Sequence, residues 1–298
     1  MNIFIAGASG AIGKPLIREL LRRGHRVTGM SRGGSSAQSL IELGATMVAV
    51  DAFNETAVRG ALEAAEADVV INQLTALPRD PSQIATAIHG DRKLRLEGGA
   101  NLLRAAQAIG VRRYLQQLSG FFLKARNELA DESDGLAVDA SPGVASSATM
   151  YAELESRLRE TGAMECVGLR YGFFYGPNTW YHPDGAVAEQ VRRGEYPILG
   201  TGQGVWSWIH IEDAALATAD AVDGPPGIYN IVDDDPSPLA RWLPAFARFV
   251  GAPPPRQIPE EGANADALYY ATRLSGASNQ KAKGALGFAP RRLEWLTA

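Results

Sequence analysis

The chain has 298 residues, of which 46% are hydrophobic and 21% charged, and its formal net charge at pH 7 is -4. These values are ordinary for a soluble globular protein with one large α/β domain or two smaller ones. The weak negative charge argues against nucleic acid as a partner, because a phosphate backbone calls for a basic surface. Cys166 is the only cysteine, which excludes an internal disulfide and a cysteine metal cage. Without a signal core or a membrane-spanning apolar run, we expect a cytoplasmic protein without a membrane partner.

The first 172 residues alternate short apolar runs with longer amphipathic ones. We expect strands at 2–7, 26–32, 46–51, 68–74, 112–120 and 166–172, and helices at 11–24, 36–44, 55–66, 94–110 and 147–161. Such alternation predicts right-handed βαβ units in a doubly wound parallel sheet, which is a Rossmann-like α/β fold. The polar stretch 124–147 is expected to be an irregular excursion on the surface.

From residue 173 onward, loops rich in glycine, proline and aromatic residues dominate the sequence. A strand and turn are expected in "GIYNIVDDDPSP", a helix in "LARWLPAFARFVG", and a linker in "APPPRQIP". We expect a dinucleotide-binding domain over 1–172, to which 205–232 returns. A smaller C-terminal substrate lobe would be formed by 173–204 and 233–298.

The stretch "GASGAIG" directly follows the first expected strand and opens the first helix. Gly7 would permit the tight turn, Gly10 would let the backbone approach a pyrophosphate, and Gly13 would allow the helix to pack on the strand. The free N–H groups at the start of this helix would face the anion. Because glycines also end strands, the triplet alone is weak evidence, but its place between strand and helix predicts a dinucleotide.

The end of the second strand should select the cofactor. A carboxylate there would bind the ribose 2′-hydroxyl of NAD, whereas this chain has Ser31 and Arg32. A guanidinium fits a 2′-phosphate, so we expect NADP rather than NAD, although an ordinary solvated arginine is the alternative. Asp51 would receive the adenine amino group or cap the following helix. The full set expected to bind the cofactor is Gly7, Ser9, Gly10, Ala11, Ile12, Gly13, Ser31, Arg32, Asp51, Ala52, Leu74, Thr75, Tyr171 and Phe173.

Several motifs in the same order resemble the extended short-chain dehydrogenase/reductase family, which includes sugar-nucleotide epimerases and dehydratases. "GASGAIG" is similar to its G-x-x-G-x-x-G loop, and "LRYGFFYGP" to its L-R-x-x-x-x-Y-G-P motif. "WIHIEDAALA" and "GASNQKAKGALGFAP" are similar to its later signatures, so the resemblance covers nearly the whole chain. The resemblance implies this fold, a nicotinamide cofactor, a small-molecule substrate and a homodimer.

The resemblance also implies the catalytic groups. In the family a serine or threonine binds the substrate oxygen, and Ser119 matches that position; a strand-end hydroxyl that serves the local backbone is the alternative. A helix tyrosine transfers a proton, and a lysine four residues later lowers its pKa and holds the nicotinamide ribose. Here Tyr151 is followed by Glu155, so the chain resembles an atypical branch without that lysine.

A second register is open for this helix. Family helices carry a glutamate eight residues after the tyrosine, and Glu155 stands fifteen residues before Arg170 at the "LR" pair. If Glu155 is that glutamate, Ser147 occupies the tyrosine position and Tyr151 the lysine position. This shifted register is favoured, because the standard one leaves an unusually short connection. Tyr151 would then bind the ribose or substrate, or would only pack under the lobe.

His182, in the loop after the Gly-Pro pair, is the best alternative acid or base. His210 is expected to start a helix, and no histidines and carboxylates have metal-ligand spacing. The aromatic loops suit a flat or apolar substrate, although packing of a small lobe predicts the same aromatics. The leading hypothesis is an NADP-binding reductase or epimerase-like enzyme with Ser119, Tyr151 and His182 at its site. The alternatives are an NADP-binding sensor without turnover and a non-redox isomerase or cyclase with a structural cofactor.

Overall fold

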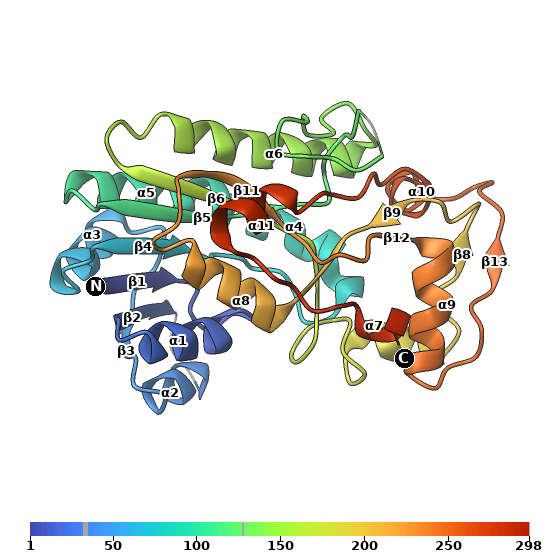
Figure 1. Ribbon diagram of the computed structural model, residues 1–298, viewed down its shortest axis with the longest axis horizontal. Coiled ribbons are helices and arrows are strands. Elements are labelled where there is room, and N and C mark those ends of the chain that lie inside the picture. The colour runs from blue at the N-terminus through green and yellow to red at the C-terminus, as the bar shows by residue number, and fades with distance from the viewer. Residues whose placement is uncertain (32–34, 127, 298) are drawn as a thin grey trace.

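A seven-stranded parallel sheet forms the centre of the molecule (Figure 1). The computed structural model describes residues 1–31, 35–126 and 128–297. The strands are β1 (Asn2–Ala6), β2 (Arg26–Ser31), β3 (Thr46–Ala49), β4 (Val69–Asn72), β5 (Arg113–Ser119), β6 (Glu165–Tyr171) and β11 (Gly227–Ile231). Their order is β11-β6-β5-β4-β1-β2-β3, so the winding reverses between β1 and β4. The expected doubly wound Rossmann-like fold is confirmed.

Helices cover both faces of this sheet (Figure 1). They are α1 (Gly13–Arg22), α2 (Ser35–Ile41), α3 (Glu55–Ala64), α4 (Ile84–Lys93), α5 (Gly99–Ala108), α6 (Pro142–Arg159), α8 (Ile211–Asp220) and α11 (Gln280–Leu286), with a short 3-10 turn η1 (Pro81–Gln83). Successive side chains of a strand point to opposite faces. Ile3 and Ile5 of β1 therefore pack with α1 and α8, whereas Phe4 and Ala6 pack with α3, α5 and α6.

The helix expected at 94–110 is longer than the sequence indicated. It begins with α4, continues through a π-helical turn η2 (Leu94–Gly98) and ends with α5. Asp91 is the only buried residue of α4, so this part of the helix has no apolar face that could reveal it. The spacing of apolar residues also could not predict the π turn, a feature that is common at functional sites.

Helix α6 begins at Pro142, earlier than the expected start at 147. A proline is tolerated in the first turn because its missing N–H would have no partner there. The N–H groups of Gly143 and Val144 donate to the Asp266 carboxylate, which comes from α10 (Ala265–Thr272). This cap joins segments far apart in the sequence, so the local pattern could not place the helix start.

The remaining elements form a lobe at the end of the molecule that the carboxyl ends of the sheet strands face (Figure 1). Besides α10 they are β7 (Phe173–Tyr175), β8 (Ile198–Leu199), β9 (Val205–Trp206), β10 (Trp208–His210), β12 (Ser237–Pro238), β13 (Gln257–Ile258), α7 (Ala186–Arg192), α9 (Leu239–Phe249) and α12 (Glu294–Thr297). Its core is strongly aromatic, with Tyr181, Trp208, Trp242 and Trp295 buried together. In the described part of the chain, no helix has the length and apolar character needed to cross a membrane.

Candidate active site

The glycine loop between β1 and α1 has the geometry of a phosphate-binding turn. Gly7 has φ +81°, and a Cβ there would lie 2.4 Å from the Gln73 carbonyl oxygen. A Cβ on Gly13 would lie 1.7 Å from the Ala8 carbonyl oxygen, so helix and strand approach too closely for a side chain. The fold itself therefore requires glycine at both positions.

Gly10 differs from these two glycines. A Cβ there would meet only the Gly7 carbonyl oxygen, at 3.2 Å, so the protein leaves space at this position. The N–H groups of Ala11 and Ile12 have no acceptor among the described residues and lie at the start of α1. A pyrophosphate would use such donors and the positive end of the helix dipole. The residues present therefore fit the phosphates of a dinucleotide at this loop.

The strands beside the loop bring the remaining nucleotide candidates to the same edge. Ser31 is buried at the end of β2, while Arg32 lies outside the described residues. Asp51 does not cap α3: its carboxylate accepts the N–H of Phe53, whereas the Asn54 side chain caps the helix by accepting the N–H of Ala57. The alternative structural role expected for Asp51 therefore belongs to Asn54.

The end of β4 is fixed by buried polar side chains. The N–H of Leu74 donates to the Asn72 side-chain oxygen at 3.0 Å. The Thr75 hydroxyl and the Ala76 N–H both donate to the Asp91 carboxylate, at 3.0 and 2.6 Å. Helix α4 thus holds the loop that contains two of the expected cofactor residues.

Ser119 ends β5 at the same edge, and its Oγ accepts the N–H of Phe121 at 3.5 Å. Beyond it, Phe121 and Phe173 stack with their ring centroids 4.1 Å apart, and Phe173 stacks on Trp206 of the lobe at 4.1 Å. This row of rings joins the sheet edge to the lobe. It can serve as a flat apolar wall for a substrate near Ser119.

Tyr171, expected at the cofactor, lies with its side chain in the core below the sheet edge. Its hydroxyl accepts a hydrogen bond from the Gln73 amide at 3.0 Å and shares another with Thr218 at 2.6 Å. Burial raises the pKa of Tyr171 to about 12. The hydroxyl is occupied within the core, so only the backbone of Tyr171 is available to a ligand.

Tyr151 lies on α6 between aromatic and charged groups. Its ring is 5.8 Å from that of Phe122, and the Arg95 guanidinium carbon lies 5.6 Å from its ring centroid. Its hydroxyl has no hydrogen-bond partner among the described residues, and 8% of the residue's surface remains exposed. Burial raises the pKa of Tyr151, and the positive Arg95 acts against that rise. The hydroxyl is therefore protonated at neutral pH and available to a ligand.

Glu155 has a role distinct from that of Tyr151. The Nε and Nη2 groups of Arg170 donate to the two oxygens of the Glu155 carboxylate at 2.7 and 2.8 Å. The Glu155 side chain is 5% exposed and that of Arg170 3%, so this is a buried bidentate ion pair between α6 and β6. The carboxylate at the spacing of the family lysine therefore anchors the helix to the sheet.

Ser147, the other candidate for the family tyrosine position, has its hydroxyl engaged by protein groups. It donates to the Gly143 carbonyl at 3.0 Å and accepts from Nη2 of Arg92 at 3.2 Å. Lys124 does not replace the missing lysine, because it pairs with Asp139 in an exposed salt bridge. Between the two candidate positions, Tyr151 is the one that presents an unpaired hydroxyl.

The two histidines of the lobe have different surroundings. His182 Nδ1 accepts the N–H of Asp184 in its own loop, and His182 makes no hydrogen bond to Ser119 or Tyr151 among the described residues. His210 caps α8, as expected, because its Nδ1 accepts the N–H of Glu212 at 3.2 Å. In the described ranges, no three His, Cys, Asp or Glu side chains converge as a metal site.

Sequence reasoning missed the charged pair that lies beside Tyr151. Asp91 and Arg95 form a buried salt bridge of 2.7 Å, with side-chain exposures of 3% and 2%. Their spacing of four residues was visible, but such pairs are usually solvated on a helix surface. Only the packing of α4 under α6 shows that this pair is buried.

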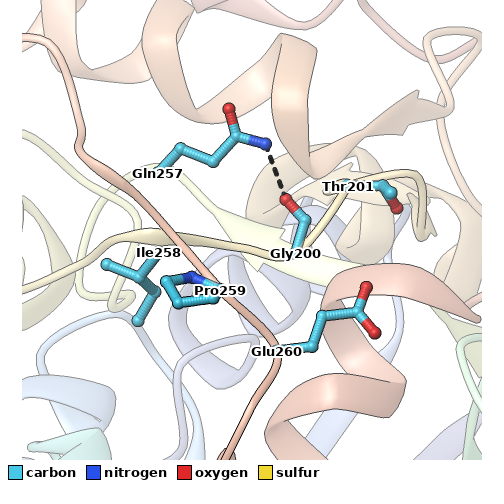
Figure 2. Close-up of a pocket in the computed structure, with 6 residues that line it drawn as sticks. All are labelled: Gly200, Thr201, Gln257, Ile258, Pro259 and Glu260. Atoms are coloured by element: carbon cyan, nitrogen blue, oxygen red, sulfur yellow. Dashed lines mark hydrogen bonds between the residues drawn. The ribbon is translucent and has the colours of Figure 1, made fainter.

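A separate depression lies between β8 and β13, at the outer edge of the lobe (Figures 1 and 2). It is open to solvent and is lined by Gly200, Thr201, Gln257, Ile258, Pro259 and Glu260. The Gln257 amide donates to the Gly200 carbonyl at 2.8 Å across it. This depression has no aromatic wall and lies away from the carboxyl ends of the sheet strands, so we place the site at those ends.

Comparisons with known proteins bear on the family and the fold. The NAD dependent epimerase/dehydratase family matches residues 3–231. The chain is 39% identical, over 99% of its length and 98% of the relative's, to a 3-diazoavenalumate denitrifying reductase from Streptomyces sp.. It is 26% identical to a 2-alkyl-3-oxoalkanoate reductase from Shewanella oneidensis, covering 86% of this chain and 68% of that protein.

A solved structure supports the fold. The UDP-glucose 4-epimerase of Stenotrophomonas maltophila, with bound NAD and formylated UDP-arabinopyranose, superimposes with a TM-score of 0.78 at 19% identity. The superposition covers 99% of this chain and 95% of that one. The family match over most of the chain, the glycine loop and the sheet order together establish that this protein belongs to the NAD dependent epimerase/dehydratase family.

Proposed function

We propose that this protein is an NADP-dependent reductase of a small, flat substrate, with a diazo compound as the first class to test. This proposal rests mainly on the glycine loop, which leaves room for a pyrophosphate at Gly10 and lies at the same edge of the sheet as Ser119 and the aromatic row. The full-length similarity to a denitrifying reductase supports reduction over epimerisation. The preference for NADP rests on Ser31 and Arg32 in the sequence.

Ser119 and Tyr151 would bind the polar end of the substrate. The unpaired Tyr151 hydroxyl would donate a hydrogen bond or a proton, which its raised pKa keeps available at neutral pH. The stacked Phe121 and Phe173 would hold a flat substrate against the nicotinamide side of the cleft and exclude water.

When bound, the reduced cofactor supplies a hydride. For a substrate in its diazonium form, a hydride supplied in this way would replace the nitrogen: the carbon–nitrogen bond would break, N2 would leave with the bonding electrons, and a C–H bond would form. A substrate that enters as the neutral diazo form takes up one additional proton. Tyr151 is the group we assign to deliver it.

The Glu155–Arg170 pair supports the shifted register of α6. With Glu155 as the family glutamate, Tyr151 takes the lysine's position and Ser147 the tyrosine's. We propose this alignment on the Glu155–Arg170 pair. Tyr151 would then act from the lysine's position, because its hydroxyl is free among the described residues whereas that of Ser147 is bound by Arg92 and Gly143.

The test is the oxidation of NADPH by the purified protein with 3-diazoavenalumate as the probe. We expect loss of the reduced-nicotinamide absorbance together with release of one N2 per NADPH. NADH should be used less efficiently, and Arg32→Ala should raise the KM for NADPH while leaving that for NADH unchanged. Release of N2 without oxidation of NADPH would contradict the proposal.

The second candidate is a sensor that binds NADP without turnover. It is favoured by one observation: among the described residues, no lysine is among the charges that shift the pKa of Tyr151. Binding of NADPH by calorimetry without its oxidation, by this probe or by 2-alkyl-3-oxoalkanoates, would support the sensor.

A further inference from the structure

A chain of buried polar contacts runs from the end of β4 to Tyr151. The Asp91 carboxylate accepts hydrogen bonds from Thr75 and Ala76 on one oxygen. Its other oxygen accepts Nε of Arg95 at 2.7 Å. The Arg95 guanidinium then lies 5.6 Å from the centroid of the Tyr151 ring. The loop expected to line the cofactor is thereby connected to Tyr151, whose hydroxyl has no hydrogen-bond partner among the described residues.

Arg95 combines burial with an unusual backbone position. It is 3% exposed, and its Nη1 has no hydrogen-bond partner among the described residues, a property that it shares with the structural Arg170. A buried polar atom without a partner is costly and rare in native proteins. Arg95 also lies in the π-helical turn η2, which interrupts the helix beside Tyr151. Such turns commonly occur at functional sites.

We propose that Arg95, oriented by Asp91, is a positioning residue that acts through Tyr151 and supplies the positive charge for which the family uses a lysine. A cation over the face of a phenol ring favours the ionised form of that phenol. Arg95 would therefore make Tyr151 a better proton donor without touching the substrate. The catalytic part of this inference rests on the proposed function. The effect of the Arg95 charge on the ionisation of Tyr151 does not.

The charges that face Tyr151 can be named. Asp91 approaches from α4 and Arg95 from η2, and the two act in opposite directions on the Tyr151 pKa. Tyr270 of α10 is the other titratable neighbour, and Tyr151 and the carboxylate of Asp266 both contribute to raising its pKa. Since Tyr270 is neutral at working pH, Arg95 and Asp91 set the local field.

The experiment is an ultraviolet difference titration of tyrosine ionisation in the protein without substrate. Subtracting Tyr151→Phe from the parent protein isolates Tyr151, and the same subtraction is repeated in each variant background. We expect Arg95→Met to raise the midpoint by about one pH unit. Asp91→Asn should lower the midpoint, since it removes a negative charge, and Arg95→Lys should keep it near the parent value.

Arg157→Met is the matched control. Arg157 lies on α6 and donates to the Leu96 carbonyl of the same π turn at 2.7 Å, but it makes no contact with the Tyr151 ring. Its replacement should leave the midpoint unchanged. If Arg95→Met does not fold, Asp91→Asn still tests the proposal through its downward shift. Shifts of the same sign in both variants, or no shift in Asp91→Asn, would overturn it.

Kinetics give an independent readout. If Arg95 acts through Tyr151, then Arg95→Met lowers kcat about tenfold or more in the parent protein but not in the Tyr151→Phe background. Opposite titration shifts in a protein that never oxidises NADPH would leave the role of Arg95 intact and reject the reductase function. If the protein is fully active as a reductase but the effects of Arg95→Met and Tyr151→Phe on kcat are additive, the role of Arg95 is rejected and the reductase function stands.

Discussion

At the scale of residues, the surroundings of a polar side chain show whether it can bind a ligand or is engaged in stabilising the fold. Glu155 and Tyr151 stand four residues apart on one helix, but Arg170 binds the first and Arg95 lies against the second. An unpaired hydroxyl at a cleft can bind a ligand, whereas a carboxylate in a bidentate pair cannot do so without breaking that pair. The same spacing therefore carries one structural and one candidate catalytic side chain.

If Tyr151 and Ser119 act on the substrate, replacing them should lower activity more than it lowers stability. We expect Tyr151→Phe to lower kcat about a hundredfold and Ser119→Ala about tenfold, because each removes a group that the proposed function assigns to the reacting end of the substrate. The unfolding free energy of Tyr151→Phe should change by less than about 0.5 kcal/mol, since the hydroxyl has no protein partner. Steady-state kinetics and urea unfolding check both. A larger loss of kcat in His182→Ala than in Tyr151→Phe would instead identify the histidine as the acid.

Glu155 gives the opposite prediction. Glu155→Gln leaves the Arg170 guanidinium buried without its counter-ion, so we expect it to destabilise the fold by about 3–5 kcal/mol. Urea unfolding measures this loss. The double variant Glu155→Leu/Arg170→Met, which removes both charges, should recover most of it. Reduced kcat at unchanged stability in Glu155→Gln would contradict a structural role for the pair.

At the scale of elements, helices are fixed by contacts that join distant segments. Asp266 of α10 binds the first N–H groups of α6, and Asp91 of α4 binds the loop after β4. On the other face of the sheet, Glu19 of α1 accepts hydrogen bonds from Arg22 and Arg23, and Arg23 also pairs with Asp220 of α8. These contacts set where helices begin and how they pack.

The ion pairs of Glu19 with Arg22 and Arg23 at α1 predict a dependence of stability on pH. Hydrogen bonds from Arg22, with a further contribution from Arg23, lower the pKa of Glu19 from 4.5 to about 2. A depressed carboxyl pKa stabilises the fold above the unfolded-state value and loses that contribution as pH falls through the folded-state value. The difference in unfolding free energy between the parent protein and Glu19→Gln should therefore be constant above about pH 5 and shrink toward pH 2. A pH-independent difference would contradict this linkage.

At the scale of the whole molecule, the sheet order places the site. The winding reverses between β1 and β4, and in doubly wound sheets ligands bind outside the carboxyl ends of the strands at such a reversal, so we expect the site there. The lobe packs against the same end and contributes Trp206 to the aromatic row. The homodimer and the cytoplasmic location expected from the sequence stay predictions.

We expect different outcomes for two substitutions in the glycine loop. Gly13→Ala places a Cβ 1.7 Å from the Ala8 carbonyl oxygen, so it should destabilise the fold by more than about 2 kcal/mol. Gly10→Ala meets only the Gly7 carbonyl at 3.2 Å, so the fold should tolerate it while NADPH binding weakens about tenfold or more. Urea unfolding and calorimetric titration separate the effects. Unchanged NADPH affinity in Gly10→Ala would show that the cofactor phosphates do not bind at this loop.

By itself, the sequence determined the fold class, the family and the glycine loop, because these rest on local patterns: alternating apolar runs, and glycines at a strand-to-helix turn. The fifteen-residue spacing of Glu155 and Arg170 favoured one alignment of the helix but predicted no contact between the two side chains. Only the tertiary structure decided that they form a buried pair, that α6 starts at Pro142 under Asp266, and that Arg95 lies against Tyr151. Each of these contacts joins residues of different elements. Burial and charge pairing depend on that assembly, which periodicity along the chain does not specify.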